Sequence, residues 1–203
     1  MVYDPVLQEP LWIASLPESA KVALPFVETK YKGIVGVEIL TAHKLCAVMY
    51  NDVVDRHLNG IYPVPHERCK WAEIAGDTWI KVLFAAEAKF LPQLEKDLES
   101  LSIEGIRLVH SEPEMIEMLP IHVSKGDALK RICNITGLNL SKATAIGDYY
   151  NDLEMIQEAH FGVAVENACE EIKAEADLIV GTNEQDAVAE TIAYVMKNHP
   201  HIF

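Results

Sequence analysis

The stretch ATAIGDYYND, residues 143–152, decides the fold because it joins a short apolar run to a turn that is rich in side-chain oxygen atoms. Residues 143–147 have the length and composition of a buried strand, and a helix is expected to begin at Asp152. In open α/β sheets, ligands bind beyond the carboxyl ends of the strands. Asp148 directly follows the expected strand, so its position favours a functional role.

The chain around this stretch alternates between helices and strands at the short spacing of a parallel sheet. Ser124 can cap a helix together with Asp127, and Gly137 can end that helix. Its expected apolar face carries Ala128, Leu129, Ile132 and Cys133. The expected elements that follow are strands at 161–165 and 177–180, a helix at 170–176, and a last helix with Val188, Ile192, Val195 and Met196. This order predicts half of a doubly wound α/β domain.

The pattern before residue 120 is different. The run VGVEILTAHKLCAVMYND predicts a hairpin that turns at Ala42, His43 and Lys44, and residues 79–85 predict another strand. A helix is then expected from leucines at helical spacing, and a returning strand after Gly105. We therefore expect an α+β domain with an antiparallel sheet at residues 1–120, and a partial parallel-sheet domain at residues 121–203.

Composition and charge exclude several classes of partner. Of the 203 residues, 50% are hydrophobic. The chain has 17 Lys and Arg and 31 Asp and Glu, which gives a net charge of -14. A nucleic-acid backbone would be repelled, because no cluster of basic residues offsets this charge. No run approaches the roughly 18 apolar residues of a membrane span, and the opening MVYDPVLQEP lacks the features of a signal peptide. We expect a cytoplasmic protein without a nucleic-acid or membrane partner.

The four cysteines show no spacing that is typical of a disulfide framework or a zinc site. Cys46, Cys69, Cys133 and Cys169 are far apart in the sequence, and no C-x-x-C motif occurs. The sequence therefore predicts reduced thiols.

The turn after the expected strand has the composition of a magnesium site. Asp148, Asn151 and Asp152 fall within one tight turn, so their oxygen atoms can converge on a hard cation such as Mg²⁺. The alternative is that Asp152 only caps its helix and Asp148 is an ordinary loop residue.

Lys125 is expected at the first position of its helix, where the helix dipole disfavours a cation by roughly 0.3–1 kcal/mol. Free N–H groups at that helix end, with Lys125 and Gly126, can bind a phosphate group, which would satisfy both the dipole and the lysine. The alternative is a solvated surface lysine. An anion site next to a cation site at one sheet edge indicates magnesium-dependent phosphoryl chemistry.

Four segments occur in an order that resembles a known family. VSKGDALKRI, AIGDYYNDLEMI, GVAVENACEEIKAEADLIV and TNEQDAVAETI resemble the C-terminal half of the Cof-type phosphatases of the haloacid dehalogenase superfamily, over residues 121–196. The resemblance implies a Rossmann-like parallel-sheet core. It also implies that the earlier residues form the inserted cap domain, which selects the substrate in that family.

The resemblance assigns roles to individual residues. It implies that Lys125 binds the substrate phosphate and assists catalysis, that Asp148 is a ligand of Mg²⁺, and that Asn151 contacts the phosphoryl group. Asp152 matches the second acid of the motif and is expected to orient Lys125 or a metal-bound water. Asn167 is a further candidate for phosphate binding, and its alternative role is a helix cap. The implied substrates are small phosphorylated metabolites, above all sugar phosphates.

The sequence departs from the family in one respect. Members of the family attack phosphorus with an aspartate of a D-x-D-G-T motif, and these 203 residues contain no D-x-D. We therefore expect that the N-terminal part of the core is missing and that this chain alone is inactive. The alternatives are a non-catalytic fragment, a degenerate binding module, or a phosphomutase of the same superfamily. We also expect self-association, because a missing strand would expose an edge of the core sheet.

Overall fold

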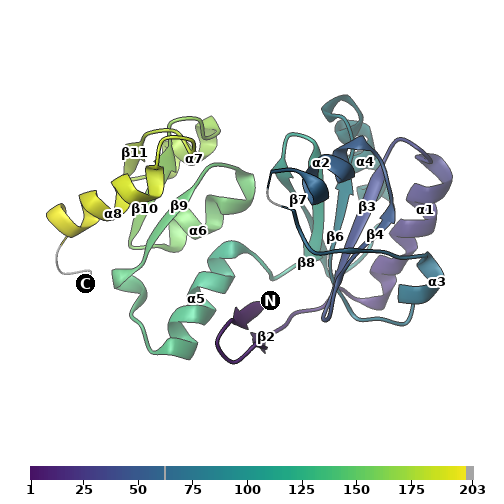
Figure 1. Ribbon diagram of the computed structural model, residues 1–203, viewed down its shortest axis with the longest axis horizontal. Coiled ribbons are helices and arrows are strands. Elements are labelled where there is room, and N and C mark those ends of the chain that lie inside the picture. The colour runs from purple at the N-terminus through teal and green to yellow at the C-terminus, as the bar shows by residue number, and fades with distance from the viewer. Residues whose placement is uncertain (62, 200–203) are drawn as a thin grey trace. The chain divides into compact units, whose positions relative to one another are not determined.

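The computed structural model describes residues 1–61 and 63–199 (Figure 1). The chain divides into two compact units, which are described separately. The first comprises Pro5–Ile121 together with Met1 and Tyr3, and the second begins at His122 and includes Val2 and Asp4. The strands β1 (Val2–Asp4) and β2 (Glu9–Trp12) form a small sheet of their own.

The first unit is built on a six-stranded sheet with the strand order β5-β4-β3-β6-β8-β7. The strands are β3 (Gly36–Thr41), β4 (Leu45–Met49), β5 (Glu67–Arg68), β6 (Trp79–Ala85), β7 (Ile106–Glu112) and β8 (Met115–Pro120). All neighbours are antiparallel except β4 and β5, which run parallel. The predicted hairpin is β3 and β4, and the predicted antiparallel sheet is confirmed.

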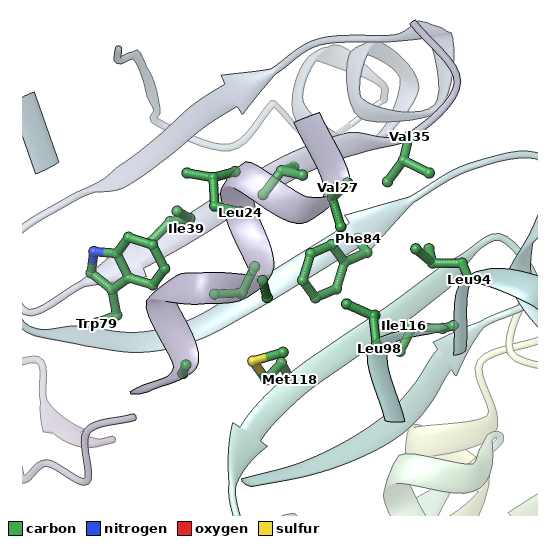
Figure 2. Packing of buried hydrophobic residues seen from close by; sticks show 14 of the residues in the cluster. Leu24, Val27, Val35, Ile39, Trp79, Phe84, Leu94, Leu98, Ile116 and Met118 are labelled. Carbon is green, nitrogen blue, oxygen red and sulfur yellow. The ribbon is translucent and has the colours of Figure 1, made fainter. Parts of the chain in front are cut away.

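Helices cover both faces of this sheet. The helical segments of the unit are η1 (Glu18–Val22), α1 (Ala23–Lys30), α2 (Asp52–Asn59), α3 (Trp71–Ile74), η2 (Ala88–Phe90) and α4 (Leu91–Ser100). On one face, Val27 of α1 and Leu98 of α4 pack with Phe84 of β6 (Figure 2). On the other face, Val54 of α2 packs with Leu83 of β6. Central strands covered on both faces are buried along nearly their whole length, which explains the continuous apolar runs in the sequence.

The structure overturns the expectation that all four thiols are reduced. Cys46 and Cys69 form a disulfide, and their Cα atoms are 5.5 Å apart. The parallel pairing of β4 with β5 brings the two together, because Cys46 lies opposite Glu67 and the Cys69 amide donates to the Ala47 carbonyl. Cysteine spacing in the sequence carries no information about this pairing. Cys133 and Cys169 are free thiols.

The second unit contains three parallel strands in the order β11-β10-β9, which confirms the predicted fold class. The strands are β9 (Thr144–Gly147), β10 (Phe161–Val165) and β11 (Leu178–Val180). Its helical segments are α5 (Lys125–Thr136), η3 (Leu140–Lys142), η4 (Tyr150–Asp152), α6 (Leu153–Glu158), α7 (Glu170–Glu175) and α8 (Ala187–Asn198). Within residues 1–61 and 63–199, no helix has the length and apolar character needed to cross a membrane.

The ends of α5 follow the prediction, but its buried face does not. The Ser124 hydroxyl accepts a hydrogen bond from the Asp127 amide at 3.0 Å, and Gly137 ends the helix in the left-handed conformation. The Asp127 carboxylate accepts from Arg131 Nε at 2.6 Å instead of completing a reciprocal cap. Of the residues in α5, only Gly126 and Cys133 are buried. The expected apolar face is therefore wrong for Ile132, which is exposed.

The last helix shows the same departure. Val195 of α8 is buried, whereas Val188, Ile192 and Met196 are exposed. Because these three residues recur every fourth position, they form one apolar stripe along the helix. The part of the chain that the structure describes leaves this stripe largely uncovered.

Candidate functional site

The acidic turn of the second unit starts where β9 ends. Gly147 closes the strand, and a Cβ atom on it would lie 2.5 Å from Cβ of Asp152, so only glycine fits there. The Asp148 amide donates to Asp152 Oδ2 at 3.1 Å, and the Asp152 amide donates to the Tyr149 carbonyl at 2.8 Å. These bonds fold residues 147–152 into one compact turn.

Asp152 is buried within this turn and pairs with Lys125. Its side chain is 6% exposed, and its Oδ1 lies 2.5 Å from Nζ of Lys125, which is 49% exposed. A buried carboxylate needs a partner of opposite charge, because burial without one is costly. Lys125 therefore compensates Asp152, and its ammonium group is fixed at the start of α5.

A close contact between α5 and α6 makes this pair possible. A Cβ atom on Gly126 would lie 2.6 Å from the carbonyl oxygen of Glu154. The two helices can approach this closely only because residue 126 is glycine. The contact places Lys125, the neighbour of Gly126, opposite Asp152, which lies two residues before Glu154.

Asp148 is the carboxylate that remains available. Both oxygens of Asp152 are engaged, one by Lys125 and the other by the Asp148 amide. Burial raises the pKa of Asp148, and the negative charge of Asp152 and a hydrogen bond with it raise this pKa further. A half-buried carboxylate of this kind is stabilised by a cation. Within the described residues, no group of three or more His, Cys, Asp or Glu side chains is arranged to hold a metal ion.

A hollow of about 790 Å³ opens next to these residues. Its polar lining includes Lys125, Asp148, Asp152, Asn183 and Asp186, and its apolar lining includes Ile146, Met155, Val188 and Ile192. Three of the four residues predicted from the turn and the preceding helix, Lys125, Asp148 and Asp152, thus line one cavity, and Asn151 is not among its lining residues.

The two predicted asparagines lie in different surroundings. Asn151 is half-buried in η4, and its side chain has no hydrogen bond to another described residue. Asn167 is exposed, and its Nδ2 donates to Oδ1 of Asn183 at 3.0 Å, while the Asn183 amide donates to Asn167 Oδ1 at 3.1 Å. The alternative role of Asn167 as a helix cap is wrong, because Cys169 occupies the N-cap position of α7 and, among the described residues, no side chain makes a capping hydrogen bond to that helix end. Asn167 thus joins the loop after β10 to the loop after β11.

Sequence reasoning did not identify Asn183 and Asp186 as site residues. Both line the hollow with Lys125 and Asp148, and both come from the loop between β11 and α8. The segment TNEQD is the signal that could have found them, since it follows the carboxyl end of a third parallel strand. Asp186 has a φ of 55°, a left-handed conformation that is uncommon for a residue other than glycine.

Comparisons with known proteins identify the family to which the chain belongs. Residues 22–192 match the family described as haloacid dehalogenase-like hydrolase. The 5-amino-6-(5-phospho-D-ribitylamino)uracil phosphatase YcsE of Bacillus subtilis is 32% identical over 126 residues, which cover 60% of this chain and 48% of that protein. The chloroplastic endoribonuclease YBEY of Arabidopsis thaliana is 42% identical over 85 residues, which cover 42% of this chain and 15% of that protein.

A solved structure described as the haloacid dehalogenase subclass IIB sugar phosphatase BT4131 has the same fold. Its TM-score is 0.77 at 19% identity, and the match covers 90% of this chain and 68% of that chain. The chain spans about half the length, or less, of the first curated relatives it matches. With residues 22–192 matched to the family, the chain belongs to the haloacid dehalogenase-like hydrolases.

Proposed function

We propose that this chain carries the phosphate-binding and metal-binding half of a magnesium-dependent phosphatase site for small phosphorylated metabolites, with sugar phosphates as the substrate class. The observation that carries the proposal is the Lys125–Asp152 pair beside Asp148 at the carboxyl end of β9. The phosphatases among the relatives and the sugar phosphatase with the same fold support the choice of substrate class.

Lys125 and Asn151 are proposed to bind the phosphate. The ammonium group of Lys125 is half-exposed at the start of α5 and lines the hollow. It can donate to a phosphate oxygen while Asp152 holds it in position. Asn151 has an uncommitted amide in the same turn, whereas Asn167 is already bonded to Asn183, so a phosphate contact from Asn167 requires that this bond opens.

Asp148 is proposed to hold Mg²⁺. The donor set fits a hard cation, because Asp148 supplies a half-buried carboxylate. Burial and the neighbouring Asp152 raise the pKa of this carboxylate, against the opposing effect of Lys125. When bound, the ion would neutralise charge on the phosphoryl oxygens. A single carboxylate with waters binds Mg²⁺ weakly, so we propose that these 203 residues have low affinity for the metal.

We also propose that the 203-residue chain alone has no turnover. The family nucleophile lies in a D-x-D motif, and this sequence contains none. We propose that the nucleophile belongs to the N-terminal part of the core. We further propose that the protein is cytoplasmic and acts on small molecules; the net charge of -14 disfavours nucleic acid as a partner.

Hydrolysis of p-nitrophenyl phosphate tests this proposal. We expect no metal-stimulated turnover from the 203 residues, and turnover once a core segment with D-x-D, taken from a relative such as YcsE, precedes them. Robust Mg²⁺-dependent activity of the 203-residue chain itself would overturn the proposal that this chain lacks the nucleophile. Binding of inorganic phosphate to the 203 residues provides a second readout, which Lys125→Met should abolish and Lys130→Met should leave unchanged.

A further inference from the structure

The first unit contains a cavity with apolar and charged lining, which lies at the end of α2 over strands β3, β4 and β6. It has a volume of about 490 Å³. Leu40, Leu45 and Leu83 provide its apolar lining, while Glu38, His57 and Lys81 are among its charged residues. All the residues that line it belong to the first unit, so it does not depend on the site at β9.

A buried carboxylate hydrogen-bonded to a histidine lies in this cavity. Glu38 is on the central strand β3 between Ala47 and Leu83, and it is only 2% exposed. Nδ1 of His57, in the last turn of α2, lies 2.8 Å from Oε1 and 3.1 Å from Oε2 of Glu38. Among the described residues, Glu38 has no other side-chain partner. Burial of an unpaired carboxylate on a central strand would destabilise the fold. The hydrogen bond from His57 offsets this cost, and it therefore also holds the imidazole ring in place.

The pair leaves His57 with one free donor. The Glu38 hydrogen bond raises the pKa of His57, against opposing effects of burial and of Lys81, and the helix C-terminus also favours a cation there. Nδ1 is engaged by Glu38, so in the imidazolium form Nε2–H is a donor that has no partner among the described residues. His57 is 30% exposed, which leaves this donor accessible from the cavity.

Among the titratable side chains of Lys, His and Glu that line this cavity, the basic ones outnumber the acidic one. His43, Lys44, His57 and Lys81 line it, and Glu38 is the only acid among the lining residues that the structure describes. The partners of Lys44 and Lys81 are Glu67 and Glu117, which lie outside the lining. A basic cavity is unusual in a chain with a net charge of -14. Lys81 and His57 also repel each other, and an anion bound between them would remove this repulsion.

We propose that this cavity binds a small organic anion, whose phosphate or carboxylate group is held by His57 and Lys81 and whose carbon skeleton lies on Leu40, Leu45 and Leu83. The binding site is independent of the proposed phosphatase function. Buried Glu38 acts as a positioning residue for His57.

Calorimetric titration of the 203-residue protein tests the proposal with charged and uncharged probes. The phosphate probe is glycerol 3-phosphate with glycerol as its uncharged counterpart, and the carboxylate probe is succinate with succinamide. We expect at least one anion to bind and its counterpart not to bind. Loss of one charge-assisted hydrogen bond should weaken binding by about tenfold or more in His57→Gln and in Lys81→Met. Comparison of the two anions identifies the preferred head group.

His110→Gln is the matched control. His110 is 29% exposed and pairs with Glu95 at 3.1 Å, so it resembles His57 in exposure and pairing, but it does not line the cavity. Affinity should change less than about twofold in this variant. Lys125→Met should also leave binding intact, which distinguishes this site from the proposed phosphate site. Equal binding of anion and counterpart, loss of affinity in the control alone, or binding that survives both His57→Gln and Lys81→Met would overturn the proposal.

Discussion

The backbone of Gly126 lies against the carbonyl of Glu154, so that a Cβ atom on residue 126 would come within 2.6 Å of that oxygen. This contact joins the start of α5 to α6 and is the structural basis of the Lys125–Asp152 pair. The position of the proposed phosphate-binding lysine thus depends on a glycine that itself has no side chain in the site.

Gly126→Ala is expected to separate the two helices. The added methyl group has no space, so the variant should lose about 1–3 kcal/mol of unfolding free energy, as in other overpacked sites. Phosphate binding should weaken as well, because Lys125 moves away from Asp152. Urea unfolding and phosphate titration measure the two effects. Gly76→Ala is the control, since a Cβ atom there meets nothing within 4 Å. Equal unfolding midpoints for the two variants would contradict the role of this contact.

The Lys125–Asp152 pair should respond differently to removal of either partner. Lys125→Met leaves a buried carboxylate without its cation, and we expect a loss of about 1–3 kcal/mol. Asp152→Asn leaves a half-exposed ammonium group that water can solvate, so its cost should be smaller. Lys130→Met, which breaks the exposed pair with Glu158, should cost at most about 1 kcal/mol. Denaturant unfolding ranks the three, and a larger loss in Lys130→Met than in Lys125→Met would refute this explanation.

The sequence predicts those residues of the candidate site that are close together in the chain. It does not predict the residues whose place in the candidate site depends on contacts between distant segments. Asp148 and Asp152 could be found together because one turn contains both. Asn183 belongs to the loop after another strand, and its place beside Asp148 follows only from the strand order β11-β10-β9. A short helix signal in the first unit also did not lead to a prediction. Asn51 caps α2 by accepting a bond from the Val54 amide at 2.9 Å, yet no helix was predicted there.

Burial was harder to predict than secondary structure. The spacing of Val188, Ile192 and Met196 correctly indicates a helix, but periodicity cannot show which neighbours cover the stripe that these residues form. The Cys46–Cys69 disulfide was missed for a related reason, because the parallel pairing of β4 with a two-residue strand has no clear signal in the sequence.

Stability under metal-free conditions should depend on Asp148. Its pKa is raised in the folded chain, so the folded chain holds this proton more tightly than the unfolded chain does. Protonation of Asp148 therefore stabilises the folded chain at low pH. This contribution to the free energy of unfolding is lost as the pH rises above 3.8, the ordinary pKa of aspartate. With a chelator present, Asp148→Asn should raise the melting temperature at neutral pH, and the difference should vanish below that value. A lower melting temperature of the variant at neutral pH would contradict the raised pKa.

The disulfide should stabilise the first unit. It closes a loop between residues 23 positions apart, for which the chain-entropy model gives about 3 kcal/mol. A reductant is expected to lower the unfolding midpoint of the unmodified chain by a corresponding amount. Cys46→Ala should show a low midpoint with or without reductant, whereas Cys133→Ala, which removes a free thiol, should keep the response to reductant. Unfolding that is insensitive to reductant in the unmodified chain would show that the bond does not form in solution.

We expect the protein to self-associate through the uncovered side of its second unit. Among the described strands, β9 pairs only with β10, and the buried Thr144 hydroxyl on β9 has no hydrogen-bond partner in the part of the chain that the structure describes. Ile192 of α8 lines the hollow beside Ile146 of β9 and is exposed, so water contacts apolar surface there. We expect light scattering to show a dimer or larger species whose fraction rises with protein concentration.

Two equally exposed isoleucines, Ile192 on α8 and Ile179 on β11, test the location of the interface. Ile192→Lys places a charge at the hollow that Ile146 of β9 also lines, and it should shift the protein to the monomer. Ile179→Lys adds the same charge at an equally exposed position on β11, the opposite edge strand, and should leave the association unchanged. A monomer at every concentration, or equal dissociation by both substitutions, would show that β9 is not the site of self-association.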